Sequence, residues 1–321
     1  MKVKYYRAIP QHKRTFHWEI LHRGFTLIVA FIQWLPELLH CFLKKPGKFK
    51  YDVSLCLIFK NEAPYLKQWL EYHLLIGVKH FYLYDNGSDD ESLEVLRPYM
   101  ERKIVTLTSW PEKHAQVEAY NDCYNRFRHE SHWIGFIDTD EYVNLRRDNN
   151  ISDMLRRYRR HPSLILQWRM FGTSGWLTED ISTPVTERFV AAWPWLTNVG
   201  KSFINNDYNF SKIWVHEHTA RFLGLPLYAV GDNHLPSPKN CPLIWSGVGK
   251  TAVINHYFSK SREYIYYKDF VRGSGLAVSS EQAKKTKGRF ELHELNNFTH
   301  DYSIQRWLVF LKERLKTNEN V

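Results

Sequence analysis

Residues 133–141, WIGFIDTDE, join a short apolar run directly to a group of acidic side chains. A nearly continuous apolar run bounded by polar residues is typical of a strand buried within a parallel sheet. In open sheets of that kind, ligands bind beyond the carboxyl ends of the strands. The stretch therefore predicts an α/β domain with a ligand-binding site directly after residue 137.

The sequence on either side of this stretch has the same organisation as far as about residue 150. We expect strands at 53–59, 80–84 and 105–108, and helices at 65–76, 91–99 and 114–128. Repeated strand-helix-strand units predict a mostly parallel central sheet with helices on both faces. Beyond residue 150 the pattern loosens into a strand at 164–169 and long aromatic loops, and the chain ends in an amphipathic helix at 304–315.

The basic charge of the chain is concentrated at its N-terminus. The formal net charge is +10, and residues 1–50 hold ten Lys and Arg against two Glu, which leaves +2 for the remaining residues. Basic residues on both sides of an apolar run favour anionic lipid as the partner over nucleic acid. We therefore predict that the N-terminal segment, 1–50, associates with a membrane surface and that the protein does not bind nucleic acid.

The apolar run at 24–35 is too short to cross a membrane by itself. Twelve helical residues cover about 18 Å of a hydrocarbon core that is about 30 Å thick. The run already contains Gln33, and extension to Leu43 adds Pro36, Glu37 and His40, so we favour a membrane-surface helix over a spanning one. A helix packed on the following domain is the alternative. A secretory signal is disfavoured because no small-residue cleavage site follows promptly.

Four cysteines are scattered through the chain without a CxxC pair or the spacing of a zinc site. We expect no disulfide framework and no structural metal cluster. Reduced thiols are typical of a protein that faces the cytosol.

Asp138 and Asp140 follow the apolar strand with one residue between them, so both carboxylates are expected on the same side of the strand end. Two carboxylates in this arrangement can share a divalent cation, and oxygen ligands suit Mn²⁺ or Mg²⁺. Such a cation neutralises the diphosphate leaving group of a nucleotide sugar. The alternative is a solvated acidic turn.

Other polar clusters follow other predicted strands. Asn61 and Glu62 come after the strand at 53–59, and residues 85–90 come after the strand at 80–84. We expect these clusters to meet residues 138–141 at one rim of the sheet. Farther along the chain, His256 is a candidate third metal ligand, and Lys260 and Arg272 are candidate phosphate contacts.

These stretches resemble glycosyltransferase family 92 and related bacterial transferases of surface-polysaccharide and lipopolysaccharide assembly. The matching motifs cover most of residues 53–275 in the order of the family. They are KNE at 60–62, EYH at 71–73, HFYLYDN at 80–86, FIDTDE at 136–141, ERF at 187–189, HY at 256–257, KS at 260–261 and RG at 272–273.

The resemblance implies a GT-A fold and a metal-dependent, inverting transfer of a hexose from a UDP-sugar to a glycan or glycolipid acceptor. Galactose is the hexose that it suggests. On this basis residues 51–300 form the catalytic domain, with a nucleotide-sugar half at 51–150 and an acceptor half at 151–300, followed by the C-terminal helix at 301–321. The residues implied for the donor pocket are Asn61, Glu62, Asp85, Asn86, Gln116, Asn121, Lys260 and Arg272; those implied for the metal are Asp138, Asp140 and His256.

Inverting transfer needs a general base beside the acceptor hydroxyl. We favour Glu187, which follows the glycine-bearing loop at 171–175 and begins a predicted helix. Its alternative role is a salt bridge to Arg188 or another arginine. The other candidates are Glu179, Asp180, Glu217 and Asp232.

Two other classes of protein are compatible with parts of the sequence. A non-catalytic carbohydrate- or lipid-binding protein on the same fold is the main alternative, although the intact Asp138, Asp140 and His256 argue against it. A nucleotidyl- or phosphate-transfer enzyme is a minor one, because the sequence lacks GxxxxGK[ST] and a Gly-rich turn after the first strand. In a bacterium, we expect the protein at the cytoplasmic face of the inner membrane.

Overall fold

The structure of the chain is a computed structural model that describes residues 16–44, 47–112, 115–197, 199–216, 218–237, 249–268 and 294–317. The helices are α1 (Phe16–Leu43), α2 (Ala63–Leu75), α3 (Ser92–Glu101), α4 (Gln116–Phe127), α5 (Ile151–Arg156), α6 (Val185–Arg188), α7 (Arg262–Tyr267), the 3-10 helix η4 (Ser303–Trp307) and α10 (Leu308–Thr317). The strands are β1 (Tyr51–Phe59), β2 (His80–Asp85), β3 (Val105–Ser109), β4 (Ser131–Phe136), β5 (Glu141–Leu145), β6 (Ser163–Met170), β7 (Ala191–Ala192), β8 (Gly200–Asn205), β9 (Thr219–Phe222), β10 (Leu225–Tyr228), β11 (Ala252–His256) and β12 (Thr299–His300).

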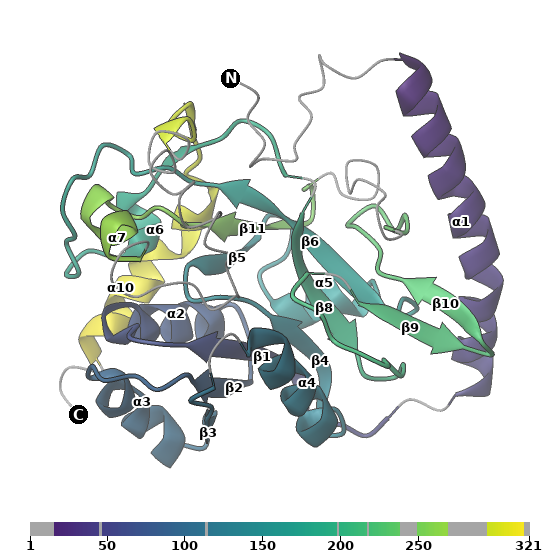
Figure 1. Cartoon of the computed structure of the whole chain (residues 1–321), viewed down its shortest axis with the longest axis horizontal. Helices are drawn as coiled ribbons and strands as arrows, with labels where there is room; N and C mark the ends of the chain where they lie inside the picture. Colours follow the sequence, from purple (N-terminus) through teal and green to yellow (C-terminus); the bar gives the residue numbers. More distant parts are fainter. Residues whose placement is uncertain are drawn as a thin grey trace.

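One eight-stranded sheet, in the order β3-β2-β1-β4-β8-β6-β11-β5, runs through the middle of the molecule (Figure 1). The pairs β3-β2, β2-β1, β1-β4 and β6-β11 are parallel, whereas β4-β8, β8-β6 and β11-β5 are antiparallel. Six strands therefore run one way, and β8 and β5 run the other way. The expected α/β class with a mostly parallel sheet is confirmed, and both predicted halves of the domain contribute strands to this single sheet.

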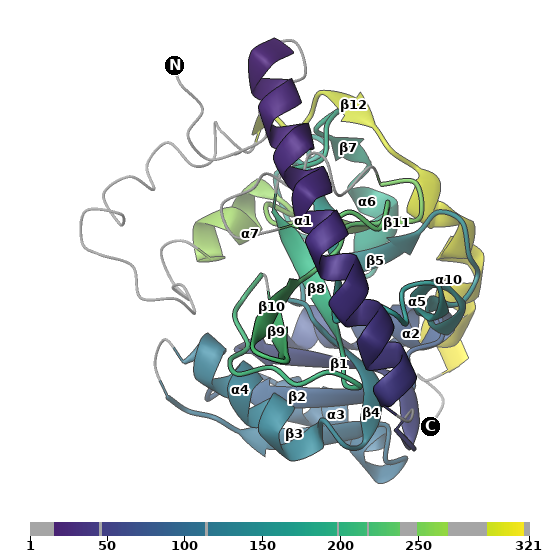
Figure 2. The same cartoon turned by 90° about the vertical axis from the view of Figure 1, so that its right-hand side faces the viewer.

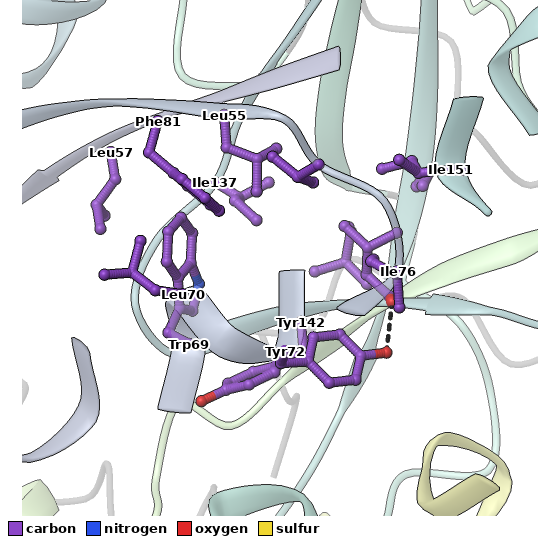
Figure 3. Packing of buried hydrophobic residues seen from close by; sticks show 14 of the residues in the cluster. Leu55, Leu57, Trp69, Leu70, Tyr72, Ile76, Phe81, Ile137, Tyr142 and Ile151 are labelled. Atoms are coloured by element: carbon purple, nitrogen blue, oxygen red, sulfur yellow. Dashed lines mark hydrogen bonds between the residues drawn. The ribbon is translucent and has the colours of Figure 1, made fainter. Parts of the chain in front are cut away.

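Alternate residues of β1 face opposite sides of the sheet, as the period of a strand requires. Leu55 and Leu57 pack with Trp69 of α2 in the larger core cluster (Figure 3). Cys56 lies in a second cluster on the other face, with Tyr120 of α4. Helices therefore cover both faces of the sheet, and the near-continuous apolar sequence of β1 follows from burial on both sides.

The expected strands and helices of the first half of the domain are confirmed to within about two residues at each end. The predicted C-terminal helix is a 3-10 turn, η4, followed by α10. Both pack onto the domain: Lys67 of α2 donates a hydrogen bond to the Leu315 carbonyl, and Arg314 pairs with Glu71 at 3.1 Å. The C-terminal segment is therefore a cover over α2.

Gly200 of β8 pairs with Gln167 of β6 in the antiparallel register of the two strands. A Cβ atom at this position would stand 1.9 Å from the carbonyl oxygen of Leu166. Because that neighbour is backbone, β6 and β8 must separate to admit a methyl group. We expect Gly200→Ala to lower the free energy of unfolding by about 3 kcal/mol, measured by denaturant titration.

Gly24 provides the matched control, since a Cβ added there meets nothing within 4 Å. Gly24→Ala is expected to leave the unfolding midpoint unchanged or to raise it slightly, because alanine favours the helix. Equal midpoints for Gly200→Ala and the unmodified chain would contradict the close approach of the two strands.

The buried imidazole of His73 is expected to make the stability of the fold sensitive to acid. It is fully buried between α2 and β5, where its Nδ1 donates to the Trp69 carbonyl and its Nε2 accepts from the Val143 amide. Burial lowers the pKa of His73 to about 3 from the ordinary 6.5. Below pH 6.5 the unfolded chain binds a proton that the folded chain does not, so stability is complete above pH 6.5 and falls as the pH falls.

We expect this imidazole to account for about 2 kcal/mol of lost unfolding free energy between pH 7 and pH 5. Denaturant titrations at the two pH values measure the loss, and His73→Gln should make it smaller. The same substitution at the exposed His129 is the control for removal of a surface imidazole. An equal loss in the His73→Gln variant would refute the assignment.

Candidate active site

The two aspartates of the acidic stretch lie in the turn between β4 and β5. Trp69 of α2 holds this turn from the core side, because its indole Nε1 donates to the carbonyls of Asp138 at 3.1 Å and Glu141 at 3.0 Å. The Tyr257 amide donates to the Asp140 carbonyl at 2.7 Å. The turn is therefore fixed by hydrogen bonds from segments on both sides of it in the chain.

Asp140 is nearly buried between two cationic or potentially cationic side chains. The antiparallel pairing of β11 with β5 places His256 opposite Glu141, and His256 Nε2 lies 3.6 Å from Asp140 Oδ1. Lys268, directly after α7, lies 2.5 Å from Asp140 Oδ2. Burial by itself raises the pKa of Asp140, but Lys268, His256 and Lys260 outweigh it and hold that pKa well below its usual range.

Asp138 is the more accessible of the two aspartates. Its Oδ1 accepts hydrogen bonds from Gln116 Nε2 and Tyr120 Oη of α4, both at 3.1 Å. Its Oδ2 accepts from Lys201 Nζ of β8 at 2.9 Å. The carboxylate is thus held at fixed positions by the start of α4 on one side and by the neighbouring antiparallel strand on the other.

Lys201 and Glu141 form a buried charge pair beneath the aspartates. Lys201 Nζ lies 3.5 Å from Glu141 Oε2, and both side chains are almost completely buried. Burial raises the pKa of Glu141 to about 7, against the opposing effect of Lys201. For Lys201, burial opposes the charge, but Asp138 and Glu141 raise its pKa above the usual value, so the ammonium ion is retained.

The ligand types around this turn suit a divalent cation. Asp138 and Asp140 offer oxygen ligands, and His256 is a buried imidazole whose Nδ1 has no hydrogen-bond partner within the described part of the chain. In the conformation present, Asp138 is turned toward Lys201, and the described residues contain no group of three His, Cys, Asp or Glu side chains that could hold a metal ion. The three predicted ligands fit the ion by type, but only Asp140 and His256 lie side by side in this conformation, so the metal site stays a prediction.

An aromatic wall extends the site toward the second half of the domain. The Trp168 ring of β6 contacts the His256 ring at a centroid distance of 4.6 Å and the His216 ring at 5.2 Å. Burial lowers the pKa of His216 to about 4, so this imidazole is neutral at physiological pH. The three rings therefore pack together beside the aspartate turn, with Trp168 and His216 only partly exposed.

The clusters predicted at the ends of the first two strands do meet. Pairing of β1 with β2 sets Phe59 beside Asp85, and the Asn61 amide side chain exchanges hydrogen bonds with Asp89. Asn61 has a positive φ of 52°, which asparagine tolerates better than most residues. Asn86 donates to the Trp110 carbonyl at 2.7 Å. Because β1 lies between β2 and β4, this rim adjoins the aspartate turn.

Lys260, the predicted phosphate contact, is buried in the structure. It is 1% exposed, and its Nζ lies 3.7 Å from the ring centroids of both Tyr65 and Tyr264 and 3.9 Å from Glu62 Oε2. Cation-π contacts and a nearby buried carboxylate hold the ammonium in this conformation, and its phosphate role stays a prediction. Glu62 likewise is buried and accepts a hydrogen bond from Tyr264 Oη instead of lining the rim.

Two further predicted side chains have structural partners. Asn121 donates to and accepts from the backbone of Ile213, so it ties α4 to the following loop instead of facing the donor. Glu187, the favoured base, lies on α6, and its Oε1 pairs with Lys312 of α10 at 2.6 Å. Its catalytic role stays a prediction. Arg272 and Glu217 lie outside the described residues.

Lys201 and Tyr120 contact Asp138 directly but are not among the residues predicted from the sequence. Lys201 stands in a segment, 200–205, whose apolar pattern is too weak to predict a strand. Tyr120 carries one signal, because it follows Gln116 by one helical turn and so shares its face of α4.

Taken together, the mixed sheet, the aspartate turn after β4 and the lysine and histidine side chains around it define a domain of the glycosyltransferase type. Residues 51–237 match glycosyltransferase family 92. Because the match covers more than half of the chain, the protein belongs to this family.

Several plant proteins are similar in sequence to part of this region. A family 92 protein of Oryza sativa is 33% identical over 157 residues, which are 48% of this chain and 26% of the relative. The galactan beta-1,4-galactosyltransferase GALS2 of Arabidopsis thaliana is 32% identical over 119 residues, 33% of this chain and 23% of that protein. This chain thus spans about a quarter of the length of these curated relatives.

Among solved structures, TarS 1-349 of S. aureus in complex with UDP-GlcNAc is 13% identical with a TM-score of 0.36, and the match covers 82% of this chain and 72% of that one. A likeness at this level carries no functional argument.

Proposed function

We propose that the protein transfers a hexose from a UDP-sugar to a glycan or glycolipid acceptor, in a metal-dependent reaction that inverts the anomeric carbon. The observation that carries this proposal is the aspartate turn after β4, with His256 and Lys268 at Asp140 and with Lys201 at Asp138, in a chain of family 92. The named galactan galactosyltransferase relatives make galactose the first sugar to test.

In the proposed complex, Asp138, Asp140 and His256 hold the divalent cation. A bound cation acts as a Lewis acid and neutralises the diphosphate as it leaves. The side chains of Gln116, Tyr120 and Lys201 orient Asp138, because they bond to both of its carboxylate oxygens.

Lys268 supplies a second positive charge at the edge of the site. Its ammonium lies against Asp140 and 3.8 Å from the Phe258 ring centroid. From that position its ammonium could donate a hydrogen bond to a phosphate oxygen of the donor. Asn61, Asp85 and Asn86, at the neighbouring strand ends, lie where the nucleoside would continue from the diphosphate.

The basic and apolar composition of the N-terminal segment supports a membrane surface as the site of the proposed activity. In a bacterial cell, the proposal puts the protein at the cytoplasmic face of the inner membrane. The acceptor is then a glycan or glycolipid that is reachable from that surface.

The test is hydrolysis and transfer by the purified chain with a panel of nucleotide sugars, each with Mn²⁺, with Mg²⁺ and with EDTA. We expect one UDP-sugar to release UDP in the presence of metal, and the release to stop with EDTA. Binding of glycans without turnover of any donor would favour a non-catalytic carbohydrate-binding protein instead.

A further inference from the structure

Helix α1 has its polar and apolar sides reversed relative to an ordinary surface helix. The side chains that face the domain are polar: Thr26, Gln33, Glu37 and His40 are each at most 6% exposed. Their spacing of seven, four and three residues keeps them on one side of the helix. The opposite side is apolar and exposed, and includes Phe25, Ile28, Phe31, Ile32, Leu35 and Phe42.

Hydrogen bonds hold the polar side of α1 to the domain. Gln33 donates to the Tyr228 carbonyl at 3.0 Å and accepts from the Tyr228 amide at 2.9 Å, as an added strand would. Both carboxylate oxygens of Glu37 lie 3.0 Å from His161 Nδ1. Two views at right angles agree that α1 lies alongside the body of the molecule, at β10 (Figures 1 and 2).

The C-terminal end of α1 packs against aromatic rings of the domain and has basic residues near it. His40 donates to the Asp207 carbonyl at 3.1 Å and stacks on the Tyr208 ring at 3.7 Å, which fixes the last turns of the helix. Exposed basic residues lie at this end: Lys44 directly follows the helix, and Arg159 and Arg160 are close enough to influence Cys41. The exposed apolar stripe is therefore bordered by positive charge.

A membrane-spanning placement conflicts with these contacts. The segment Arg23–Leu43 is long and apolar enough to cross a bilayer. Crossing would carry Gln33, Glu37 and His40 into hydrocarbon and remove each from its partner in the domain, which is unfavourable for polar and charged groups. With the contacts kept, the domain beside α1 would itself have to enter the bilayer.

We propose that α1 is a monotopic membrane helix that lies flat on an anionic lipid bilayer, with its polar side fixed to the domain and its apolar stripe in the lipid. An interfacial helix inserts its apolar side to the depth of the headgroup and upper acyl region, and basic residues at its border bind anionic headgroups. We propose a bilayer as the partner of this surface because the exposed aromatic and aliphatic stripe suits the acyl region, and the cations at its border suit the anionic headgroups. This inference does not depend on the transferase proposal.

The first experiment measures co-flotation of the full chain with vesicles of phosphatidylcholine alone and of phosphatidylcholine mixed with phosphatidylglycerol. We expect binding to the mixed vesicles, and at least about tenfold weaker binding for Phe31→Glu. Phe310→Glu is the matched control, because Phe310 is a similarly exposed phenylalanine on α10, away from the stripe. Equal binding of the two variants, or self-association of the chain without vesicle binding, would overturn the proposal.

A second experiment separates a flat helix from a spanning one. Single cysteines at Ile28, Leu35 and Phe42, in a chain with Cys41 and Cys241 replaced by serine, carry spin labels whose depth in the bilayer is measured by collision with oxygen and with a soluble nickel complex. A flat helix gives similar shallow depths at all three positions. A spanning helix spreads the first and last over about 21 Å and contradicts the inference.

Discussion

Asp140→Ala is expected to reduce sugar transfer by about 10³-fold, with little loss of folded protein. The substitution removes the carboxylate that faces both His256 and Lys268 and that we assign to the metal. It also leaves Lys268 free to bind donor phosphate directly, so UDP binding without metal should persist while its metal dependence disappears. Steady-state transfer rates and calorimetric titration of UDP with and without Mn²⁺ measure the two effects.

Asp153→Ala is the control for loss of a carboxylate. Asp153 pairs with Arg156 on the surface of α5, with its side chain 55% exposed. Transfer within about twofold of the unmodified rate is expected for this variant. If Asp140→Ala also kept a rate of that size, the aspartate turn would not be the catalytic centre, and the function proposed for the chain would have to be given up.

Lys201→Met is expected to destabilise the fold by about 3–5 kcal/mol, because it leaves the buried Glu141 carboxylate without its cation. Lys201 is fully buried, with its ammonium 2.9 Å from Asp138 and 3.5 Å from Glu141. Denaturant titration at pH 8 measures the loss, since Glu141, with a pKa of about 7, is mostly ionised there. Asp138 also loses a hydrogen bond, so donor affinity should fall.

Two variants test this explanation. Adding Glu141→Gln to Lys201→Met removes the unpaired charge, so the double variant should regain part of the lost stability. Lys316→Met removes a lysine that is 72% exposed, and a change within about 0.5 kcal/mol is expected. A Lys201→Met chain as stable as the unmodified one would show that the buried ammonium is dispensable.

Much of the site could be predicted because its parts lie at the ends of strands with strong local patterns. The apolar run before Asp138 predicts a buried strand, and parallel strands bring their carboxyl ends to one rim. Asn61 and Asp85 therefore met where they were expected. His256 was found through its motif, and the pairing of β11 with β5 places it beside Asp140.

The least predictable parts of the site are long side chains with a charge. Lys260, predicted at phosphate, lies between two tyrosine rings, and Glu187, predicted at the acceptor, pairs with Lys312; both roles stay predictions. A lysine or glutamate can extend its charge several ångströms from its Cα, so its motif position does not fix its partner. Family resemblance named these residues, but it did not give the direction of their side chains.

The α/β class, the order of the first strands, the aspartate turn and the basic, apolar character of the N-terminus could be predicted from the sequence, because each depends on the periodicity or composition of neighbouring residues. That Lys201 lies under Asp138 and that α1 turns its polar side inward is visible only in the folded chain. The first depends on the antiparallel register of β8 against β4, and the second on Tyr228 and His161, which lie more than a hundred residues away from the helix. A contact between such distant segments produces no periodic pattern in the sequence of either segment. The residues that meet are specified only when the whole sheet has assembled.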